Sequence, residues 1–394
     1  MTDLARAAVL TGFGKPLEIR EFPILAPEPG GLVVAVEAAT VCGTDVHNWE
    51  GHTPSLKPPV IPGHEGVGRI IAFGDQAGAD SRGTPLALGD RVVWGHANCG
   101  KCHACTMLQD ETLCADRFIG MLTPCTRPPH LHGTFADHAH IHPRAGRIRV
   151  PDAVDSELAS AASCALRSVI AAFNRLGALD YRDTVLIQGA GPLGLFATAV
   201  ASLQAPRRLI VIGAPDARLE LAEEFGADAT ISIEAYPDPA ERTAIVHELT
   251  NGRGADVLFE FAGSTHAFGE GVEMAAPKAR YVMAGAVGGP PQPVPVPLLI
   301  KRNLTVIGSL GAAIGAYADA LEFIERFKDR FAWDRLLGPG RYSLEDATLA
   351  LQRTSDLEET KAVILPGRIP AFRVIRGFWR HALGEPAGQS AASW

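Results

Sequence analysis

The sequence predicts an α/β protein in which a doubly wound, parallel-sheet domain is inserted into a β-rich domain. At 394 residues the chain exceeds what one hydrophobic core usually serves, so we expect two domains. Apolar and polar residues alternate between glycines and prolines in residues 4–40, and further strand patterns follow at 67–72 and 89–94, which indicates short strands joined by turns. Over residues 184–284, strand patterns alternate with helical ones, as in a parallel sheet covered on both faces.

The domain boundaries are placed where these patterns change. We expect residues 1–160 and 305–366 to form the β-rich domain and residues 161–304 the inserted domain. Residues 367–394 are basic and then small and polar. Within this tail, residues 369–383 are compatible with an amphipathic helix, and we expect the remainder to be disordered.

Composition excludes several classes of partner. The net charge of −8 opposes binding to the polyanion of a nucleic acid. No apolar run approaches the roughly 18 residues needed to cross a bilayer, and the N-terminus has no signal-peptide pattern. We therefore expect a cytoplasmic protein without nucleic-acid or membrane partners, whose seven cysteines are metal ligands or free thiols rather than disulfides.

The first candidate site lies on loops between strands of the β-rich domain. Cys42, His64 and Glu65 offer a thiolate, an imidazole and a carboxylate, the ligand types of catalytic zinc, which usually keeps one position for water. Thr44 and His47 add a hydroxyl and an imidazole through which a proton could leave. Any one of these residues alone is more often an ordinary structural residue, but their combination indicates a catalytic metal site.

A cluster of four cysteines follows and indicates a structural zinc. A closed set of four thiolates leaves no open position for chemistry. Free surface thiols are the weaker alternative, because exposed clustered thiols invite oxidation. The expected ligands are Cys99, Cys102, Cys105 and Cys114.

Two further stretches have both a functional and a structural interpretation. Residues 118–133 form a long Pro-rich loop with two histidines and an arginine, equally compatible with a substrate lid and with a surface insertion. His138, His140 and His142 fall on one side of a period-2 strand. That face resembles a metal site, but a solvated strand face is favoured.

The strongest signal of the inserted domain is the apolar strand at residues 184–188, which runs into Gly-x-Gly-x-x-Gly and then into an apolar helix. Gly189 makes the tight turn, Gly191 lets the backbone approach a pyrophosphate, and Gly194 lets the helix pack on the strand. The helix N-terminus offers amides and its positive dipole end to the phosphates. We therefore expect a dinucleotide-binding domain.

The end of the next strand leaves the choice of coenzyme open. Gly213 stands where NAD enzymes usually place the acid that binds the ribose 2′-hydroxyl. Arg218 could bind the 2′-phosphate of NADP bidentately. It could equally lie along the adenosine of NAD, with Asp216 replacing the missing acid.

In combination, these motifs resemble the zinc-dependent medium-chain alcohol and polyol dehydrogenases over nearly all of residues 7–366. The motifs that carry the resemblance are Cys-Gly-Thr-Asp-Val-His at 42–47, Gly-His-Glu at 63–65, the four-cysteine loop and Gly-Ala-Gly-Pro-Leu-Gly at 189–194. Glycine at position 43 makes the chain resemble the polyol and threonine dehydrogenases in particular. The resemblance implies a GroES-like β-rich catalytic domain, a Rossmann domain, two zinc ions per chain, and a homodimer or homotetramer.

The resemblance also implies residue roles. Cys42, His64 and Cys164 would bind the catalytic zinc, and Glu65 would ligate when water leaves. Thr44 would accept the proton of a small-molecule alcohol and pass it through the coenzyme ribose to His47 while hydride moves to NAD or NADP. The implied coenzyme contacts are Gly189, Gly191, Pro192, Leu193, Gly194, Gly213, Arg218, Ser168 and Ala262.

We expect the substrate to be a secondary alcohol, with a polyol, cyclitol or hydroxylated metabolite favoured. A primary alcohol or aldehyde dehydrogenase of the same fold is one alternative, and a catalytically silent zinc-binding relative is another. Polar and aromatic residues near the zinc would suit a hydroxyl-bearing or anionic substrate. The candidates are Trp49, His52, Trp94, Arg127 and His130.

Overall fold

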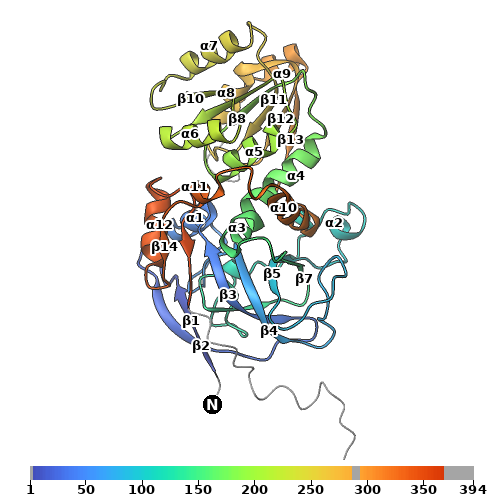
Figure 1. Cartoon of the computed structure of the whole chain (residues 1–394), viewed down its shortest axis with the longest axis vertical. Coiled ribbons are helices and arrows are strands. Elements are labelled where there is room, and N and C mark those ends of the chain that lie inside the picture. The colour runs from blue at the N-terminus through green and yellow to red at the C-terminus, as the bar shows by residue number, and fades with distance from the viewer. Residues whose placement is uncertain (1–2, 286–292, 368–394) are drawn as a thin grey trace, which may run out of the picture.

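The computed structural model describes residues 3–285 and 293–367, which form two lobes stacked along the long axis of the molecule (Figure 1). The predictions of an amphipathic helix at residues 369–383 and of disorder beyond it lie outside the described residues. No helix within the described ranges combines the length and the apolar character needed to span a bilayer.

The lower lobe is the predicted β-rich domain. Its main sheet has the order β14-β15-β3-β4-β5-β7, with β6 also paired to β3, and the β1–β2 hairpin lies beside it. The strands are β1 (Leu4–Val9), β2 (Glu18–Pro23), β3 (Leu32–Thr40), β4 (Gly66–Phe73), β5 (Arg91–Ala97), β6 (His138–Ile141), β7 (Ala145–Arg149), β14 (Arg341–Tyr342) and β15 (Val363–Ile364).

Strand β3 is the centre of this lobe. It is buried along almost its whole length and pairs antiparallel with β4, β6 and β15, and it is rich in valine and alanine. Register shifts between β3 and β4 mark two bulges, which bend the sheet. The strand ends at Thr40, so that Cys42 lies directly at the start of α1 (Gly43–Glu50).

The upper lobe is a doubly wound domain with a fully parallel sheet in the order β10-β9-β8-β11-β12-β13. Its strands are β8 (Thr184–Gln188), β9 (Arg208–Gly213), β10 (Ala229–Ser232), β11 (Ala255–Glu260), β12 (Ala275–Met283) and β13 (Thr305–Gly308). Its helices are α5 (Pro192–Ser202), α6 (Asp216–Glu224), α7 (Pro239–Leu249), α8 (Ala267–Met274) and α9 (Val296–Arg302). Alternate strand residues enter separate apolar cores on the two faces, Val185 and Ile187 on one and Leu186 on the other.

The expected boundary of the inserted domain at residue 304 is one strand too early. Thr305–Gly308 forms β13, the parallel edge strand beside β12, so this stretch belongs to the sheet of the upper lobe. A short apolar strand gives no sequence signal of which sheet it joins.

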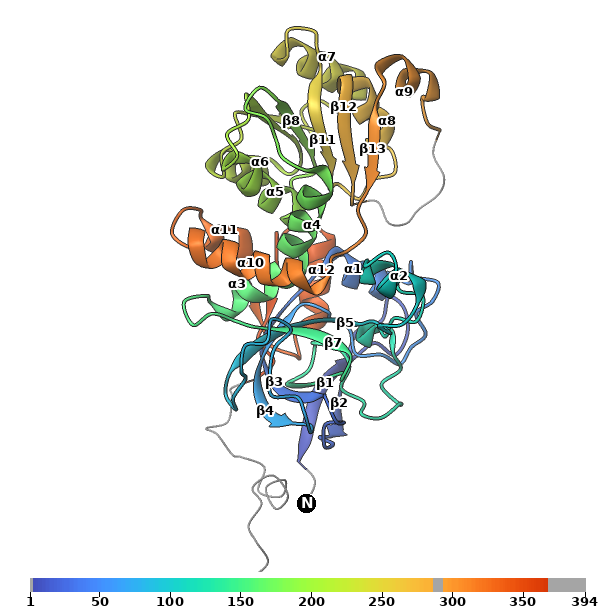
Figure 2. The same cartoon turned by 90° about the vertical axis from the view of Figure 1, so that its right-hand side faces the viewer.

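Helices connect the two lobes. The helical stretch of α3 (Ser156–Ala161), the π-helical turn η3 (Ala162–Leu166) and α4 (Arg167–Leu176) rises from β3 toward the upper sheet. Helix α10 (Ile314–Phe327) crosses this stretch between the lobes (Figure 2). Helix α11 (Trp333–Leu337) contacts α3, and α12 (Ala347–Ser355) packs on α1.

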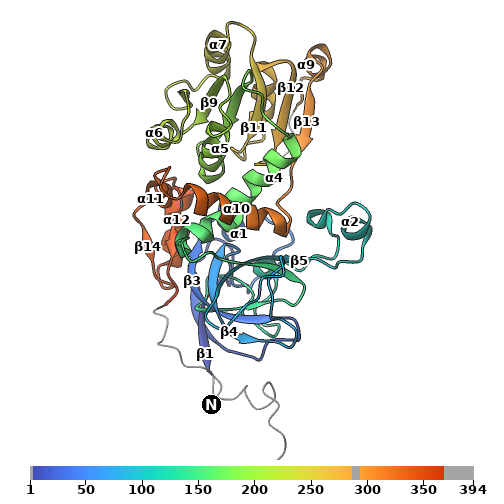
Figure 3. The ribbon, with the colours of Figure 1, turned by 45° about the vertical axis from the view of Figure 1, so that its right-hand side comes forward.

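A small lobe extends from the end of β5 and stands away from the body beside α10 (Figure 3). It contains α2 (His103–Thr106) and the 3-10 turn η1 (Glu111–Leu113), and the turn η2 (Gly120–Leu122) follows. A carboxylate oxygen of Glu111 accepts a hydrogen bond of 2.7 Å from the backbone amide of Ile314, which ties this lobe to the start of α10.

Candidate active site

Three elements bring the first predicted ligand set together. Cys42 is the N-cap of α1, His64 and Glu65 directly precede β4, and Cys164 lies in η3. One ligand atom from each of these four residues lies within 4.8 Å of the others. The His64 Nε2 and Cys164 Sγ atoms are 3.3 Å apart, which shows that residues 100 positions apart in sequence meet at one point.

Asp45 orients this cluster, although sequence analysis did not single it out. Its Oδ2 accepts the amide of Cys42 at 3.0 Å, its Oδ1 accepts the amide of Gly63 at 3.2 Å, and Oδ1 lies 3.3 Å from His64 Nδ1. The carboxylate is completely buried. A carboxylate that contacts the second ring nitrogen of a ligating histidine is a common feature of metal sites. The position of Asp45 within the Cys-Gly-Thr-Asp motif was the sequence signal that could have pointed to this role.

The turn before His64 requires glycine. Gly63 has a φ of +90°, and a Cβ there would lie 2.3 Å from the Oγ1 of Thr134 and 2.5 Å from the ring of Phe135. A larger residue would therefore displace His64 together with the turn.

Cys164 is presented by an irregular helix. The π-helical turn η3 contains one residue more per turn than an α-helix and commonly marks a functional site. The buried Arg167 donates from Nε to the carbonyl of Ser163 at 2.7 Å, and one of its terminal nitrogens lies 3.7 Å from Cys164 Sγ. Its guanidinium also stacks over the Tyr317 ring at 4.8 Å, so a fixed positive charge adjoins the thiol.

Glu65 is held in a buried ion pair. Its Oε2 lies 2.6 Å and its Oε1 2.7 Å from the Nζ of Lys361, and the Thr40 hydroxyl donates to Oε2. Burial raises the pKa of Glu65 to about 7, and the ammonium of Lys361 opposes that shift. Sequence analysis missed Lys361, because nothing in a sequence marks a pair 296 positions apart.

The donor set fits zinc. Two thiols and an imidazole converge in a buried position, and these are the ligands of tetrahedral zinc sites. The hydrogen bond with Cys164 and burial raise the pKa of Cys42 to about 12, so without a metal this thiol keeps its proton. A bound metal ion would replace this proton, because a thiol coordinates metal as the thiolate.

The two relay candidates follow on α1. The Thr44 hydroxyl lies 3.8 Å from Cys42 Sγ and is partly buried. His47 is one turn further along the helix, with 63% of its side chain exposed. The helix therefore leads from the thiol cluster to the protein surface.

A pocket opens beside His64. Its walls come from β5, from the predicted loop at 118–133 and from α10. The lining residues are Gly63, His64, Trp94, Gly95, His96, Ala97, Phe118, Gly120, Met121, His132, Thr134, His140, His142, Ala145 and Tyr317. This lining contains no lysine, arginine, aspartate or glutamate, so no full charge faces the pocket apart from that of a protonated histidine.

The favoured interpretation of the histidine strand as a solvated face is wrong. His140 is 8% exposed, and both His140 and His142 line the pocket. The face is covered by the loop at 118–133, whose Phe118 ring centroid lies 4.8 Å from that of His142. Burial lowers the pKa of His140 and of His132 to about 4, so both imidazoles are neutral at physiological pH.

Two polar atoms in the pocket have no protein partner. The Nε2 of His140 and the Oγ1 of Thr134 are buried and make no hydrogen bond among the described residues. Buried polar atoms normally have a partner, so these two atoms mark a position for a polar group of a ligand or for water.

Of the residues expected near the zinc, only some line the pocket. Trp94 lines the pocket, whereas Trp49 donates to a backbone carbonyl of the N-terminal segment and Arg127 is exposed on the loop surface. His130 bonds to a carbonyl of its own loop at 2.9 Å, and His52 lies beside His47 at the end of α1. Arg127 and His130 therefore do not contribute to the pocket, although other residues of the same loop do.

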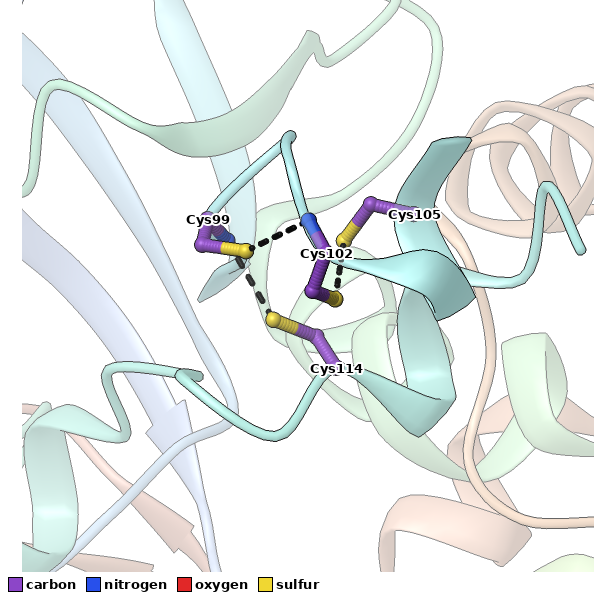
Figure 4. Close-up of side chains that lie close together, drawn as sticks. All are labelled: Cys99, Cys102, Cys105 and Cys114. Carbon is purple, nitrogen blue, oxygen red and sulfur yellow. Dashed lines mark hydrogen bonds between the residues drawn. The ribbon is translucent and has the colours of Figure 1, made fainter. Parts of the chain in front are cut away.

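The second ligand set is also brought together. The four sulfur atoms of Cys99, Cys102, Cys105 and Cys114 lie within 4.8 Å of one another in the projecting lobe (Figure 4). Amides point at the sulfurs, with the amide of Cys102 donating to Cys99 Sγ at 3.3 Å and that of Cys99 to Cys114 Sγ at 3.3 Å. The amide of Cys105 helps to lower the pKa of Cys102 to about 6, which favours the thiolate form that binds zinc.

The predicted coenzyme edge lies at the carboxyl ends of β8, β9 and β11. Gly189 has a φ of +111°, and a Cβ at Gly194 would lie 1.7 Å from the Gly189 carbonyl oxygen. A Cβ at Gly191, the N-cap of α5, would meet nothing within 4 Å, so this side of the turn is open. Pro192 is the first residue of α5.

The remaining predicted coenzyme residues differ in exposure. Ala262 is exposed after β11, and its amide adjoins the glycine turn, 2.7 Å from a Cβ built at Gly189. Leu193 is half-buried in α5, and Ser168 is half-buried near the start of α4.

Gly213 and Arg218 stay predictions as coenzyme contacts, and their surroundings in the structure differ. A Cβ at Gly213 would lie 2.5 Å from the Cβ of Ala190, so close packing on the glycine turn excludes a side chain there. The guanidinium of Arg218 is buried and donates to the carbonyls of Leu357 and Glu359 at 3.1 and 2.9 Å. Arg218 is thus engaged with the segment after α12, while Asp216 is exposed at the start of α6.

Comparison with known proteins matches both lobes to described families. Residues 28–152 match the alcohol dehydrogenase GroES-like domain and residues 192–326 the zinc-binding dehydrogenase family. The chain is 36% identical to 5-exo-hydroxycamphor dehydrogenase of Pseudomonas putida over 88% of its length and 95% of that protein. It is 31% identical to L-threonine 3-dehydrogenase of Pyrococcus horikoshii over 79% and 84% of the two chains. The crystal structure of an alcohol dehydrogenase from Thermotoga maritima superposes with a TM-score of 0.85 at 32% identity, covering 93% of this chain and 100% of that one.

Proposed function

Because the chain belongs to the zinc-dependent medium-chain alcohol and polyol dehydrogenases, we propose that it oxidises an uncharged, polyfunctional secondary alcohol with NAD⁺ at the Cys42–His64–Cys164 site. The observation that carries this proposal is the convergence of those three donors beside a pocket with an uncharged lining. Bound zinc supplies Lewis acidity, which lowers the pKa of an alcohol hydroxyl. The same geometry supports Glu65 as a group that reaches the metal when water leaves, since one of its oxygens lies within 4.8 Å of the other donors.

The residues of α1 support a route for the proton. Thr44 Oγ1, next to Cys42, accepts the proton of the substrate hydroxyl. His47, exposed one turn later, would receive the proton by way of a bound coenzyme's ribose and release it to solvent. The chain thereby moves one proton out of a buried site while hydride passes to the nicotinamide.

The pocket supports the choice of substrate. An uncharged lining offers no counter-ion to the carboxylate of a hydroxy acid or to an amino acid. The unpaired His140 Nε2 and Thr134 Oγ1 offer hydrogen bonds to a second oxygen of the substrate. Polyols, cyclitols and hydroxylated ring ketones carry such an oxygen, and the relative of Pseudomonas putida is named for a hydroxycamphor.

The proposed preference for NAD⁺ rests on residues that follow β9. Arg218 is committed to two backbone carbonyls, so it offers little to a 2′-phosphate. Asp216 is exposed at the start of α6, where its carboxylate suits a ribose hydroxyl and repels a phosphate. We therefore expect NAD⁺ to be preferred.

The test is the initial rate of absorbance rise at the reduced-nicotinamide band, with NAD⁺ and NADP⁺ in turn. The panel pairs cyclohexanol with cyclohexanediols, inositol, sorbitol and hydroxylated ring ketones, and includes lactate and threonine. We expect chelator-sensitive rates with the uncharged polyfunctional alcohols, and kcat/KM at least about tenfold lower for cyclohexanol. Highest rates with lactate or threonine would contradict the substrate class.

The coenzyme assignment has its own prediction. Replacing Asp216→Ser should raise kcat/KM for NADP⁺ relative to NAD⁺ by about tenfold, because a repulsive carboxylate is removed. The control is Glu220→Ser, an exposed acid on the same helix, which should leave the ratio unchanged. An equal ratio in wild type and Asp216→Ser would remove Asp216 from the site.

We also propose a homodimer or homotetramer in the cytoplasm. The seven cysteines are all free thiols in the structure, as expected in a reducing compartment. Light scattering on a sizing column measures the oligomer directly, and a monomer at working concentration would contradict this part.

A further inference from the structure

The exposed end of α1 carries a second group of metal-ligand side chains, separate from both cysteine sites. His47 and Glu50 lie one turn apart on the helix, and His52 follows it. Their ligand atoms all lie within 4.8 Å of one another. The side chains of the two histidines are 63% and 64% exposed and that of Glu50 is 31% exposed, so solvent ions reach all three.

The end of the helix builds this arrangement. Gly51 has a φ of +86° and reverses the chain, and the amide of His52 donates to the carbonyl of His47 at 2.8 Å. His52 is thereby folded back over the last turn. A Cβ at Gly51 would lie 2.9 Å from the ring of Phe13, so this turn is restricted to glycine by its neighbour as well.

The distances match a tetrahedral ion. Two nitrogen or oxygen ligands, each about 2.05 Å from zinc, lie about 3.3 Å apart in tetrahedral geometry. The Nδ1 atoms of His47 and His52 are 3.5 Å apart, and Glu50 Oε2 is 3.2 Å from His52 Nδ1 and 3.9 Å from His47 Nδ1. The three donor atoms are therefore spaced closely enough to share one ion, whose fourth position water can take.

We propose that His47, Glu50 and His52 form a surface site for a divalent transition ion such as Zn²⁺, and that its occupancy slows alcohol oxidation. An imidazole bound to metal through Nδ1 carries its hydrogen on Nε2 and has no lone pair left to accept a proton. The ion thus removes His47 from the proton route. This second part rests on the proposed function, in which His47 releases the proton.

The donor types set this site apart from the other two. It has no thiolate, and its nitrogen and carboxylate ligands are those that zinc, nickel and cobalt share. All three side chains are on the surface, so the ion exchanges with solvent. We expect weaker binding than at the cysteine sites, and hence a response to the free-ion concentration.

Metal counting tests the site without any assay of activity. Holoenzyme is dialysed against low-micromolar Zn²⁺ and its zinc content is measured by mass spectrometry. We expect three zinc ions per chain in wild type and two in His52→Ala. The control His247→Ala removes a histidine of α7 that contacts the carbonyl of Glu273, and it should keep three. Two zinc ions in wild type, or three in His52→Ala, would overturn the site.

Kinetics test the consequence. Added Zn²⁺ should lower the wild-type kcat by about tenfold or more, reversibly by chelation, and raise its solvent isotope effect. The rate of His52→Ala, taken relative to its own rate without added zinc, should change little over the same range. A third ion that binds without slowing wild type would overturn the inhibitory role. Failure of every alcohol as substrate would count against the proposed function, and the metal count would still decide the site.

Discussion

The two carboxylate oxygens of Asp45 accept hydrogen bonds from the backbone amides of Cys42 and Gly63. The Oδ1 atom also lies beside Nδ1 of His64. One side chain thus sets the positions of two proposed metal ligands. It touches neither substrate nor coenzyme in the proposed function, so it is a positioning residue.

Replacing Asp45→Asn should weaken the catalytic zinc site, because a neutral amide oxygen accepts from His64 more weakly than a carboxylate and the amide nitrogen cannot accept from the backbone amide of Cys42. We expect zinc to leave to a chelator at a concentration about 10- to 100-fold lower than in wild type. The measurement is zinc release followed with a chromogenic chelator. Asp80→Asn is the control, since this buried aspartate accepts the amides of Arg82 and Thr84 away from the metal donors.

His140 gives a pH-dependent contribution to stability. Its folded pKa is about 4, below the ordinary 6.5, so between these values the unfolded chain binds more protons than the folded one. Stability is therefore lost as the pH falls from 6.5 toward 4. The contribution amounts to about 2 kcal/mol between pH 7 and pH 5.

The variant His140→Asn should accordingly lose less stability than wild type on going from pH 7 to pH 5. Unfolding midpoints in urea at the two pH values measure this difference. His247→Asn, a histidine of the upper lobe, serves as the control and should behave as wild type. Equal acid sensitivity of wild type and His140→Asn would show that His140 is protonated in the folded state.

Residue positions near each other in sequence were predictable, whereas contacts across the fold were predictable only where the family resemblance implied them, as for Cys42, His64 and Cys164. The proximity of Thr44 to Cys42 follows from their places two residues apart in the first turn of α1. The burial of His140 depends on the loop at 118–133 that covers its face, and the Glu65–Lys361 pair depends on the return of the chain at β15. Neither is a property of a local pattern.

At the scale of elements, the glycine turn and its helix were the most predictable part. Its requirements are largely local, because Gly194 packs on the Gly189 carbonyl within the same turn and Gly189 adopts a positive φ, although a Cβ at Gly189 would also meet the backbone of Phe261 and Ala262 after β11. The edge strand β13 was assigned to the wrong domain because four residues carry no period that distinguishes two sheets. The π-helical turn η3 has no separate signal in the sequence, since residues 161–166 are apolar or small throughout and show no period that an extra residue would shift.

The projecting lobe is the element whose order depends most on metal. Its polar ties to the body include the contact of Glu111 with Ile314 and an ion pair of 3.3 Å between Asp110 and Arg175. Exposed ion pairs contribute little. The four sulfurs are therefore its main cross-link when zinc is bound.

Replacing Cys102→Ser should leave one tightly held zinc per chain instead of two and speed proteolytic cleavage within residues 99–114 by about tenfold or more. Zinc content and the rate of limited proteolysis are the measurements. Cys125→Ser is the matched control, because Cys125 is buried outside both sulfur clusters. Unchanged zinc content in Cys102→Ser would contradict a structural zinc.

At the scale of the whole molecule, the segment 357–361 adds a further link to the helices that connect the two lobes. Arg218 of α6 donates to the carbonyls of Leu357 and Glu359, and Lys361, two residues later, pairs with Glu65 below the thiol cluster. This short stretch of backbone therefore provides one connection between the upper lobe and the proposed metal site, beside the continuous helix that carries Cys164.

The variant Arg218→Met tests whether this arginine joins lobes or binds coenzyme. As a lobe contact, it should lower kcat/KM for NAD⁺ and NADP⁺ by the same factor and lower the unfolding temperature by a few degrees, at a cost of about 1–3 kcal/mol. Steady-state kinetics with both coenzymes and thermal unfolding measure these effects. A selective loss with NADP⁺ would restore Arg218 as a 2′-phosphate ligand.

The partners of Arg218 across the lobe boundary are main-chain carbonyls, which every amino acid provides. Chimaeras that exchange upper lobes among relatives would keep this contact whatever residues occupy 357 and 359, provided that the incoming lobe brings an arginine at the start of its second helix. A side-chain donor on one lobe and main-chain acceptors on the other make the boundary tolerant of such exchanges.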